Sequence, residues 1–245
     1  MKIIRYAFAM MPMVLLLANS SSSDLKKEDL KGPRISSFPN VVIKKTILNA
    51  AELFNAWNLG SSGLSLAAFE MAQQGFAKLD KKKLLKKDSV LTIIDYSKPS
   101  SEKRLFVLDM ITGKILFNSL VAHGRNSGHN YASQFSNKAS SYKTSLGFYI
   151  TLNTYKGGNG YSLRLKGCES GINDKAYNRA IVLHGADYVS ADFIEKNGYL
   201  GRSYGCPAVP LSLNKEIIEV IKDGSCMFFY YPSKKYSNQS KILNG

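Results

Sequence analysis

The sequence lacks a second long apolar run: apart from its N-terminus, no segment of the 245 residues could span a bilayer as a helix. This absence excludes a multi-pass membrane protein. Acidic residues are also scarce, with 18 Asp and Glu against 33 Lys and Arg, which gives a formal net charge of +15. Such an excess favours an anionic partner, which could be nucleic acid, anionic lipid or an acidic cell-wall polymer. The hydrophobic share of 44% excludes a largely disordered or fibrous chain.

The apolar run at the N-terminus belongs to a predicted signal peptide over residues 1–20. Lys2 and Arg5 form a positive stretch, residues 6–17 form an apolar core, and small residues follow. The core is short for a bilayer and has no amphipathic rhythm, so cleavage is favoured over a membrane anchor or a buried N-terminal helix. We therefore expect export to the periplasm or cell envelope with no stable membrane anchor afterwards, which argues against nucleic acid as the partner. Residues 21–40, rich in Ser, Lys and Pro, are expected to be a flexible lead-in.

Cysteine is scarce and odd in number, with Cys168, Cys206 and Cys226. In an exported chain, this leaves at least one thiol unpaired or pairing with another molecule. Cys226 lies in the apolar run SCMFFYYP, which is typical of a buried strand, and Cys168 lies in the polar segment KGCESG. These two could form a disulfide or both remain reduced. Cys206 differs from both, because glycine and proline frame its segment.

The rest of the chain is predicted to be a helical start followed by a β-rich body. Apolar residues at helical spacing predict helices over 41–58 and 64–79, so that residues 41–88 form a helical hairpin and a basic linker. Residues 89–232 alternate β-rich runs with turn residues, and the first three runs favour an antiparallel meander. The polar stretch 124–142 is expected to be a long loop. We expect a mainly β fold with a few short helices and a loose tail. That tail covers residues 233–245.

Two segments carry candidate chemistry, IVLHGADYVS with His184 and GRSYGCPAVP with Cys206. A thiol becomes a useful nucleophile as the thiolate, and a neighbouring imidazole is the usual means of lowering its pKa. We therefore predict that the Cys206 sulfur lies close to a His184 ring nitrogen. Gly205 permits a tight turn and Pro207 has no N–H, so the backbone amides of Tyr204, Gly205 and Cys206 are candidates for an oxyanion hole. By spacing alone, the cysteine and the histidine could equally be core residues.

These two segments, together with HGRNSGHNYASQFSN, SSYKTSLGFY and GYSLRLKG, resemble the L,D-transpeptidase catalytic domain family of bacterial cell-wall enzymes, with its YkuD-like fold. More specifically, they resemble the murein L,D-transpeptidase catalytic domain subfamily. The resemblance covers residues 90–232 and implies a β-rich sandwich or barrel, with Cys206 as nucleophile and His184 as base. Two positions depart from the pattern. Many members carry His where this chain has Tyr204, and Arg or Asn where it has Ala208.

The resemblance implies acyl transfer on the stem peptides of peptidoglycan without a metal or organic cofactor. Cys206 would form a thioester with a tetrapeptide stem, and an amine of another stem would then give a 3-3 cross-link. His184 would shuttle the protons while a backbone carbonyl orients its ring. A carbapenem would acylate Cys206. The alternatives are an L,D-carboxypeptidase on the same scaffold and a non-catalytic peptidoglycan-binding protein, and the sequence indicates neither the acceptor nor the oligomeric state.

The residues expected to bind substrate surround this pair. Arginines suit the carboxylates of the substrate, and Arg202 is the candidate for the cation missing at Ala208, although each arginine could equally be solvated or structural. His123 at the start of the polar loop is expected to line the cleft. Three aromatic residues, given below, are expected to be pocket walls or core. The candidates for substrate contacts are Ser203, Arg202, His123, Arg125, Arg164 and Gly185. The candidate walls are Tyr204, Tyr188 and Phe148.

The three histidines of the sequence also raise the question of a zinc site. Zinc in proteins is often held by histidine, and His123, His129 and His184 could be interpreted as such a set. The spacing of His123 and His129 fits none of the helical metal motifs, so no metal is expected. His129 is expected to be a surface residue.

Overall fold

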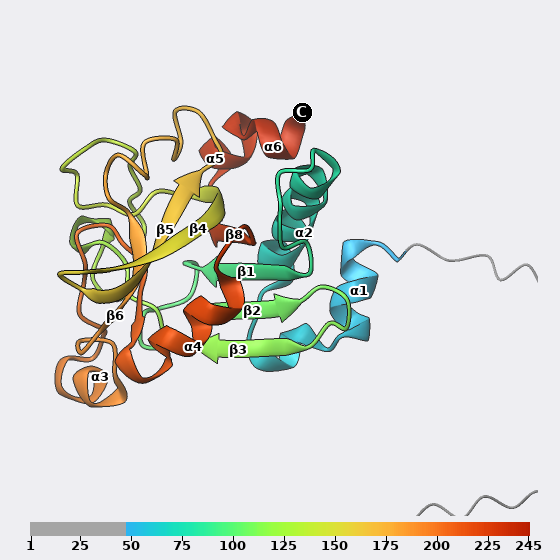
Figure 1. Ribbon diagram of the computed structural model, residues 1–245. Helices are drawn as coiled ribbons and strands as arrows, with labels where there is room; N and C mark the ends of the chain where they lie inside the picture. Colours follow the sequence, from blue (N-terminus) through green and yellow to red (C-terminus); the bar gives the residue numbers. More distant parts are fainter. Residues whose placement is uncertain (1–47) are drawn as a thin grey trace, which may run out of the picture. The chain divides into compact units, whose positions relative to one another are not determined.

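The structure, a computed structural model, describes residues 48–245 (Figure 1). The predicted signal peptide, the lead-in over 21–40 and the first part of the helix expected over 41–58 lie outside the described residues. No helix within residues 48–245 is both long and apolar enough to cross a membrane.

Two helices open the described chain and form the predicted hairpin. They are α1 (Ala50–Ala56) and α2 (Leu66–Lys81), joined by a 3-10 turn over Leu59–Ser62. The first helix begins at Ala50 rather than at residue 41, because Asn49 and Glu52 form a capping box at its N-terminus. The second helix packs on the sheet through a buried face that includes Phe69 and Phe76.

Gly75 permits an especially close approach between α2 and the sheet. A Cβ atom at this position would lie 2.0 Å from the Phe148 ring, which is itself fully buried. The helical hairpin therefore packs against the sheet and covers part of it.

Eight strands form one mixed sheet in the order β3-β2-β1-β8-β4-β5-β6-β7. The first three strands are the predicted antiparallel meander, and β8 adds to it in parallel with β1. A long antiparallel hairpin of β4 and β5 follows. The order ends with β6, which carries His184, and β7, which follows Cys206 in the chain. The strands are β1 (Val90–Asp95), β2 (Leu105–Asp109), β3 (Ile115–Ser119), β4 (Gly147–Gly157), β5 (Gly160–Gly167), β6 (Val182–Ala186), β7 (Ala208–Pro210) and β8 (Cys226–Tyr230).

The two ends of the strand order return to each other. Ala122, which follows β3, forms an antiparallel bridge with Ala208 of β7, and its N–H donates to the Ala208 carbonyl at 2.8 Å. Gly124 forms a second bridge with Ser203. The sheet therefore curls round on itself, and the predicted mainly β fold with a few short helices is confirmed.

Two further helices flank the candidate site. The helix α3 (Ala191–Asn197) follows β6 and begins at Ser190, whose hydroxyl accepts from the Phe193 N–H at 3.2 Å. The helix α4 (Leu211–Ile221) follows β7 directly and buries Ile217, Ile218 and Ile221. Because α4 packs on β6, it fixes the strand that carries His184 from the core side.

The C-terminal residues are packed on the sheet, which corrects the expectation of a loose tail. They form α5 (Lys234–Gln239) and α6 (Lys241–Asn244), and Tyr236 and Leu243 are buried. The buried carboxylate of Glu169 accepts from the Tyr236 hydroxyl at 3.0 Å and from the Ser240 hydroxyl. Apolar side chains and serine caps thus hold a segment whose polar composition suggested mobility.

Candidate active site

The thiol of Cys206 lies against the beginning of the strand that carries His184. Its Sγ accepts from the Val182 N–H at 3.5 Å and donates to the Ala180 carbonyl at 3.7 Å. His184 lies opposite Ala208 in the parallel pair β6–β7. The fold therefore brings together the two segments singled out in the sequence. Cys206 as a whole residue is half-buried.

A glycine in the left-handed region and a serine hydroxyl shape the turn before Cys206. Gly205 has a φ of +125°, a conformation that side chains disfavour. The Ser203 hydroxyl donates to the Cys206 carbonyl at 2.6 Å and accepts from the Gly205 N–H at 3.0 Å. The Thr144 hydroxyl donates to the Gly205 carbonyl at 3.1 Å and so fixes the turn from the opposite side.

This turn bears on two expectations. Ser203 is buried and its hydroxyl bonds to the backbone of the turn, so its observed role is to hold Cys206 in place. The Gly205 N–H is occupied by Ser203, which removes it from the candidate oxyanion hole. Among residues 48–245, the N–H groups of Tyr204 and Cys206 have no protein acceptor, and these two amides remain candidates.

The His184 ring is held in one orientation by the backbone. The ring is buried, and its Nδ1 lies 2.9 Å from the Gly185 carbonyl. A carbonyl can only accept, so Nδ1 carries the proton and Nε2 is left with a free lone pair. This is the backbone orientation that the family resemblance implied for the base.

At rest, no hydrogen bond joins the Cys206 thiol to the His184 ring within the described residues. Burial raises the pKa of the Cys206 thiol, and the Val182 N–H and the charge of Arg179 offset this effect only in part. Burial also lowers the pKa of His184, although its bond to Gly185 acts in the opposite direction. Within the described residues, the hydrogen bonds of Sγ go to Val182 and Ala180, and none goes to His184. Both groups are therefore neutral at rest, because burial penalises each charged form.

Arg179 supplies a cation near the thiol that the sequence analysis missed. Its guanidinium donates to the Lys143 carbonyl at 2.7 Å and to the Ser136 carbonyl at 2.8 Å, and its charge lowers the pKa of Cys206. Within the part of the chain that the structure describes, no carboxylate forms a salt bridge with it. The one signal in the sequence was its place in the run RAIVLHG, just before the strand of His184.

The three arginines expected from the sequence to bind substrate have contacts that differ from those of Arg179. Arg202 donates to the Gly128 carbonyl at 3.1 Å and to the Arg125 carbonyl at 3.3 Å, so it braces the loop after β3. The Arg125 guanidinium stacks over the rings of two tyrosines. Arg164 of β5 lies opposite Val182 of β6, and Val182 is the residue whose N–H donates to the Cys206 sulfur. The Cζ atom of Arg125 lies 4.3 Å from the centroid of the Tyr142 ring and 4.8 Å from that of the Tyr204 ring.

His123 is buried behind the site, which corrects the expectation that it lines the cleft. Arg104 donates to its Nδ1 at 2.7 Å, and its Nε2 lies 3.3 Å from the Gly128 carbonyl. Burial and the Arg104 charge lower its pKa to about 3, so the ring is neutral. Its backbone carbonyl accepts from the Ser203 N–H at 3.0 Å, and in this way His123 supports the cysteine turn. His129 is on the surface, as predicted, against the Tyr199 ring.

Gly185 and Phe148 belong to the packed interior, which for Phe148 is the core role that the sequence had left open. A Cβ atom at Gly185 would lie 3.0 Å from Asn214 and Leu211 of α4, so this glycine serves helix packing. Phe148 is fully buried and stacks on Phe228 with ring centroids 4.2 Å apart.

Tyr188 and Tyr204 remain as candidate pocket walls. Burial, followed by the charge of an ionised Cys206, raises the pKa of Tyr188 to about 12. Tyr204 is 66% exposed beside Cys206 in the chain. All three cysteines are free, so Cys168 and Cys226 do not form the disulfide that the sequence left open. Residues 48–245 contain no cluster of His, Cys, Asp or Glu that could hold a metal ion.

Comparison with known proteins gives one match that covers most of the described chain. A family model described as "L,D-transpeptidase catalytic domain" matches residues 61–230, which is more than half of the chain. No curated protein matches significantly.

Three similar solved structures are distant from this chain in sequence. An L,D-transpeptidase from Mycobacterium smegmatis is 13% identical over 58% of this chain and 59% of its own, with a TM-score of 0.38. L,D-transpeptidase 1 of Mycobacterium tuberculosis is 12% identical over 58% and 62%, with a TM-score of 0.34. An Enterococcus faecium L,D-transpeptidase is 14% identical over 58% and 50%, with a TM-score of 0.35. The chain thus spans less than two thirds of the length of each of these relatives.

Proposed function

The chain belongs to the L,D-transpeptidase catalytic domain family, and we propose that it is an exported peptidoglycan L,D-transpeptidase with Cys206 as its nucleophile. The observation that carries this proposal is the contact of the Cys206 sulfur with Val182, two residues before His184 on the same strand. A half-buried cysteine and a fixed, neutral imidazole are the two groups that thiol acyl transfer requires.

The first half of the reaction acylates the enzyme. The Cys206 sulfur attacks the carbonyl carbon of the third stem residue, and the thiol proton passes to Nε2 of His184. The S–C bond forms, the bond to the terminal D-alanine breaks, and the proton returns to the departing amine. Because both groups are neutral at rest, proton transfer accompanies attack, and no standing thiolate is needed. The N–H groups of Tyr204 and Cys206 are the candidates for stabilising the oxyanion.

The second half of the reaction returns the enzyme to its resting state. An amine of another stem attacks the thioester, His184 accepts the amine proton, and the S–C bond breaks as the new amide forms. The same proton then restores the thiol. Water in place of the amine would give an L,D-carboxypeptidase, and the acceptor that reaches the thioester decides between these outcomes.

Arg179 contributes the positive charge that favours the thiolate as it develops during attack. We expect Arg179→Met to slow alkylation of Cys206 by iodoacetamide about tenfold at about pH 8, because a raised thiol pKa lowers the thiolate fraction. Arg179→Lys keeps the charge and should recover part of the rate. Arg125→Met, which removes an arginine that stacks on tyrosines, is the matched control. An alkylation rate for Arg179→Met equal to that of the unchanged protein, at an unchanged melting temperature, would contradict this role.

Product analysis tests the proposed function. Purified protein is incubated with muropeptides that carry tetrapeptide stems, and the products are separated and weighed by mass spectrometry. Cross-linked dimers with loss of one D-alanine support the transpeptidase, whereas tripeptides alone would identify the carboxypeptidase. If folded protein yields neither product and gains no adduct from a carbapenem, the non-catalytic alternative is favoured.

Export rests on residues 1–20, with Lys2 and Arg5 ahead of the apolar core. It is tested by N-terminal sequencing of the protein recovered from the cell envelope. A start near residue 21 is expected, and an intact N-terminus in the cytoplasm would overturn it.

A further inference from the structure

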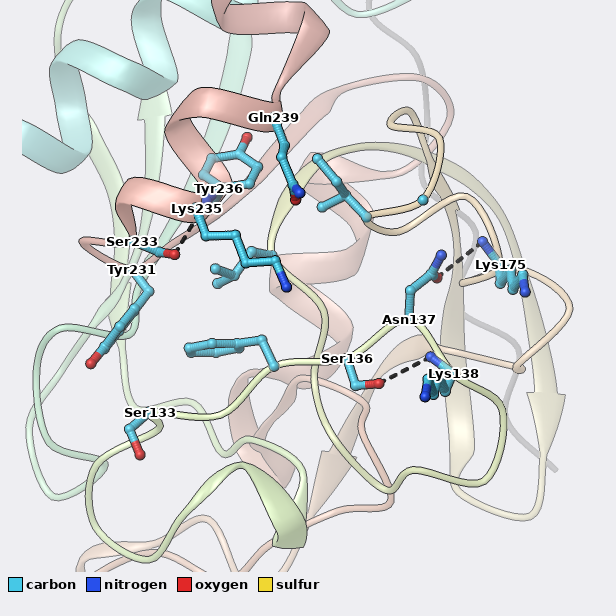
Figure 2. Close-up of a pocket in the computed structure, with 14 residues that line it drawn as sticks. Ser133, Ser136, Asn137, Lys138, Lys175, Tyr231, Ser233, Lys235, Tyr236 and Gln239 are labelled. Carbon is cyan, nitrogen blue, oxygen red and sulfur yellow. Dashed lines mark hydrogen bonds between the residues drawn. The ribbon is translucent and has the colours of Figure 1, made fainter.

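A cavity of about 560 Å³ opens on the described chain away from Cys206, which is not among its lining residues (Figure 2). Three segments distant in sequence, together with Leu146, form its walls. The segments are residues 133–138 of the loop after β3, residues 171–175 between β5 and β6, and residues 231–239, which include α5. The volume lies in the range of sites that hold a small ligand or a short piece of peptide.

The lining of the cavity combines lysines with apolar side chains. Figure 2 shows Lys235 reaching in from one wall, while Lys138 and Lys175 lie on the opposite wall. Phe135 and Tyr231 form an aromatic wall with ring centroids 5.0 Å apart. A ligand that fits this lining carries anionic groups on a partly aliphatic frame.

No carboxylate neutralises these lysines. The lining contains no acidic residue, and within the described chain none of the three lysines forms a salt bridge. The nearby Asp174 carboxylate is engaged by the Asn137 side chain at 2.7 Å and the Gly171 N–H at 2.8 Å. With three lysines in the lining and one carboxylate beside it, the cavity carries an excess of positive charge, and a carboxylate is its complement.

One residue connects this cavity to the candidate active site. Ser136 lines the cavity, and its carbonyl accepts from Arg179 at 2.8 Å. The charge of Arg179 also lowers the pKa of Cys206. Arg179 therefore contacts a residue of the cavity wall and also acts electrostatically on the Cys206 thiol.

We propose that this cavity is a second peptide site, which holds the carboxylates of a peptidoglycan stem outside the Cys206 site. The choice of a stem peptide rests on the proposed function, whereas its anionic and aliphatic character follows from the lining. Lys138, Lys175 and Lys235 pair with the carboxylates, and the aromatic wall packs on the aliphatic side chain of the diamino acid.

The test measures binding without catalysis. The Cys206→Ala protein is titrated with a fluorescein-labelled tripeptide, L-Ala-γ-D-Glu-diaminopimelate, and fluorescence anisotropy gives the dissociation constant. Adding Lys235→Glu or Lys138→Glu is expected to weaken binding about tenfold, since each reverses a charge in contact with a carboxylate. Lys215→Glu, an exposed lysine on α4, is the matched control and should leave binding unchanged. A tripeptide with amidated carboxylates should bind about as weakly as the Lys235→Glu variant.

The second site would be overturned by no binding of the peptide, by equal affinity of the Lys235→Glu and Lys215→Glu variants, or by equal affinity for the amidated peptide. Inorganic phosphate that displaces the peptide at the same concentration as free tripeptide would reduce the cavity to a general anion site, which also overturns the proposal. If the cavity variants lose binding while the unchanged protein makes no product, the proposed function fails and the peptide site stands. If products form and Lys235→Glu binds as before, the cavity proposal fails alone.

Discussion

Replacing Cys206 by alanine is expected to reduce release of D-alanine from tetrapeptide stems by about 10⁴-fold or more, to the detection limit. The nucleophile forms the bond on which both halves of the reaction depend, and its removal leaves only the binding and oxyanion groups. The fold should survive, because the Ser203 hydroxyl bonds to the backbone of residue 206 and not to the thiol. Product release is measured by chromatography, and the melting temperature by circular dichroism.

Cys168→Ala is the matched control for this loss. Cys168 is also a free thiol, and burial together with the Glu169 charge raises its pKa to about 12, so it stays protonated. Its replacement should leave activity within about twofold of the unchanged protein, because Cys168 lies outside the candidate active site and the change to alanine is small. If Cys168→Ala abolished release and Cys206→Ala did not, the nucleophile would be misassigned.

His184→Gln is expected to slow acyl transfer by about 10²- to 10⁴-fold, the range usual for removal of a general base. Glutamine keeps a polar side chain of similar length but cannot accept the thiol proton. His129→Gln is the matched control, because His129 is exposed on the loop after β3 and should leave the rate unchanged.

The pH profile distinguishes a base from a residue that merely packs. Burial lowers the folded-state pKa of His184 below its ordinary 6.5, so the neutral ring is retained as the pH falls past that value. The acid limb of the rate profile should therefore lie below pH 6.5. In His184→Gln this limb should vanish, and the residual rate should rise with pH as the thiol itself ionises. An acid limb that survives unchanged in His184→Gln would exclude His184 as the base.

Much of the fold could be predicted from local patterns. The turn residues between the first three β-rich runs separate strands that pair as a meander, because short connections favour antiparallel neighbours. The hairpin of β4 and β5 follows from the glycine-rich turn between them. The segments of Cys206 and His184 could be recognised from the sequence for two reasons. A cysteine framed by glycine and proline and a histidine at a strand end are unusual, and both segments resemble the family pattern.

The remainder depended on contacts between distant segments, which spacing does not encode. His123 and Arg104 become partners across 19 residues, and this pairing buries a histidine that seemed free to meet substrate. Arg179 faces the thiol because loop carbonyls of Ser136 and Lys143 hold its guanidinium. The tail packs because the isolated carboxylate of Glu169 needs the hydroxyl groups that the tail provides.

The most direct test of the account is the mass of the protein during the reaction. Protein is mixed with a tetrapeptide donor in the absence of an amine acceptor, quenched in acid within the first turnover, and digested for peptide mapping. The account predicts a tripeptide acyl group on the fragment that contains Cys206, with one D-alanine released for each acylated chain. An acyl group on any other residue, or cross-linked product formed while Cys206 stays unmodified and replaceable by alanine, would contradict it.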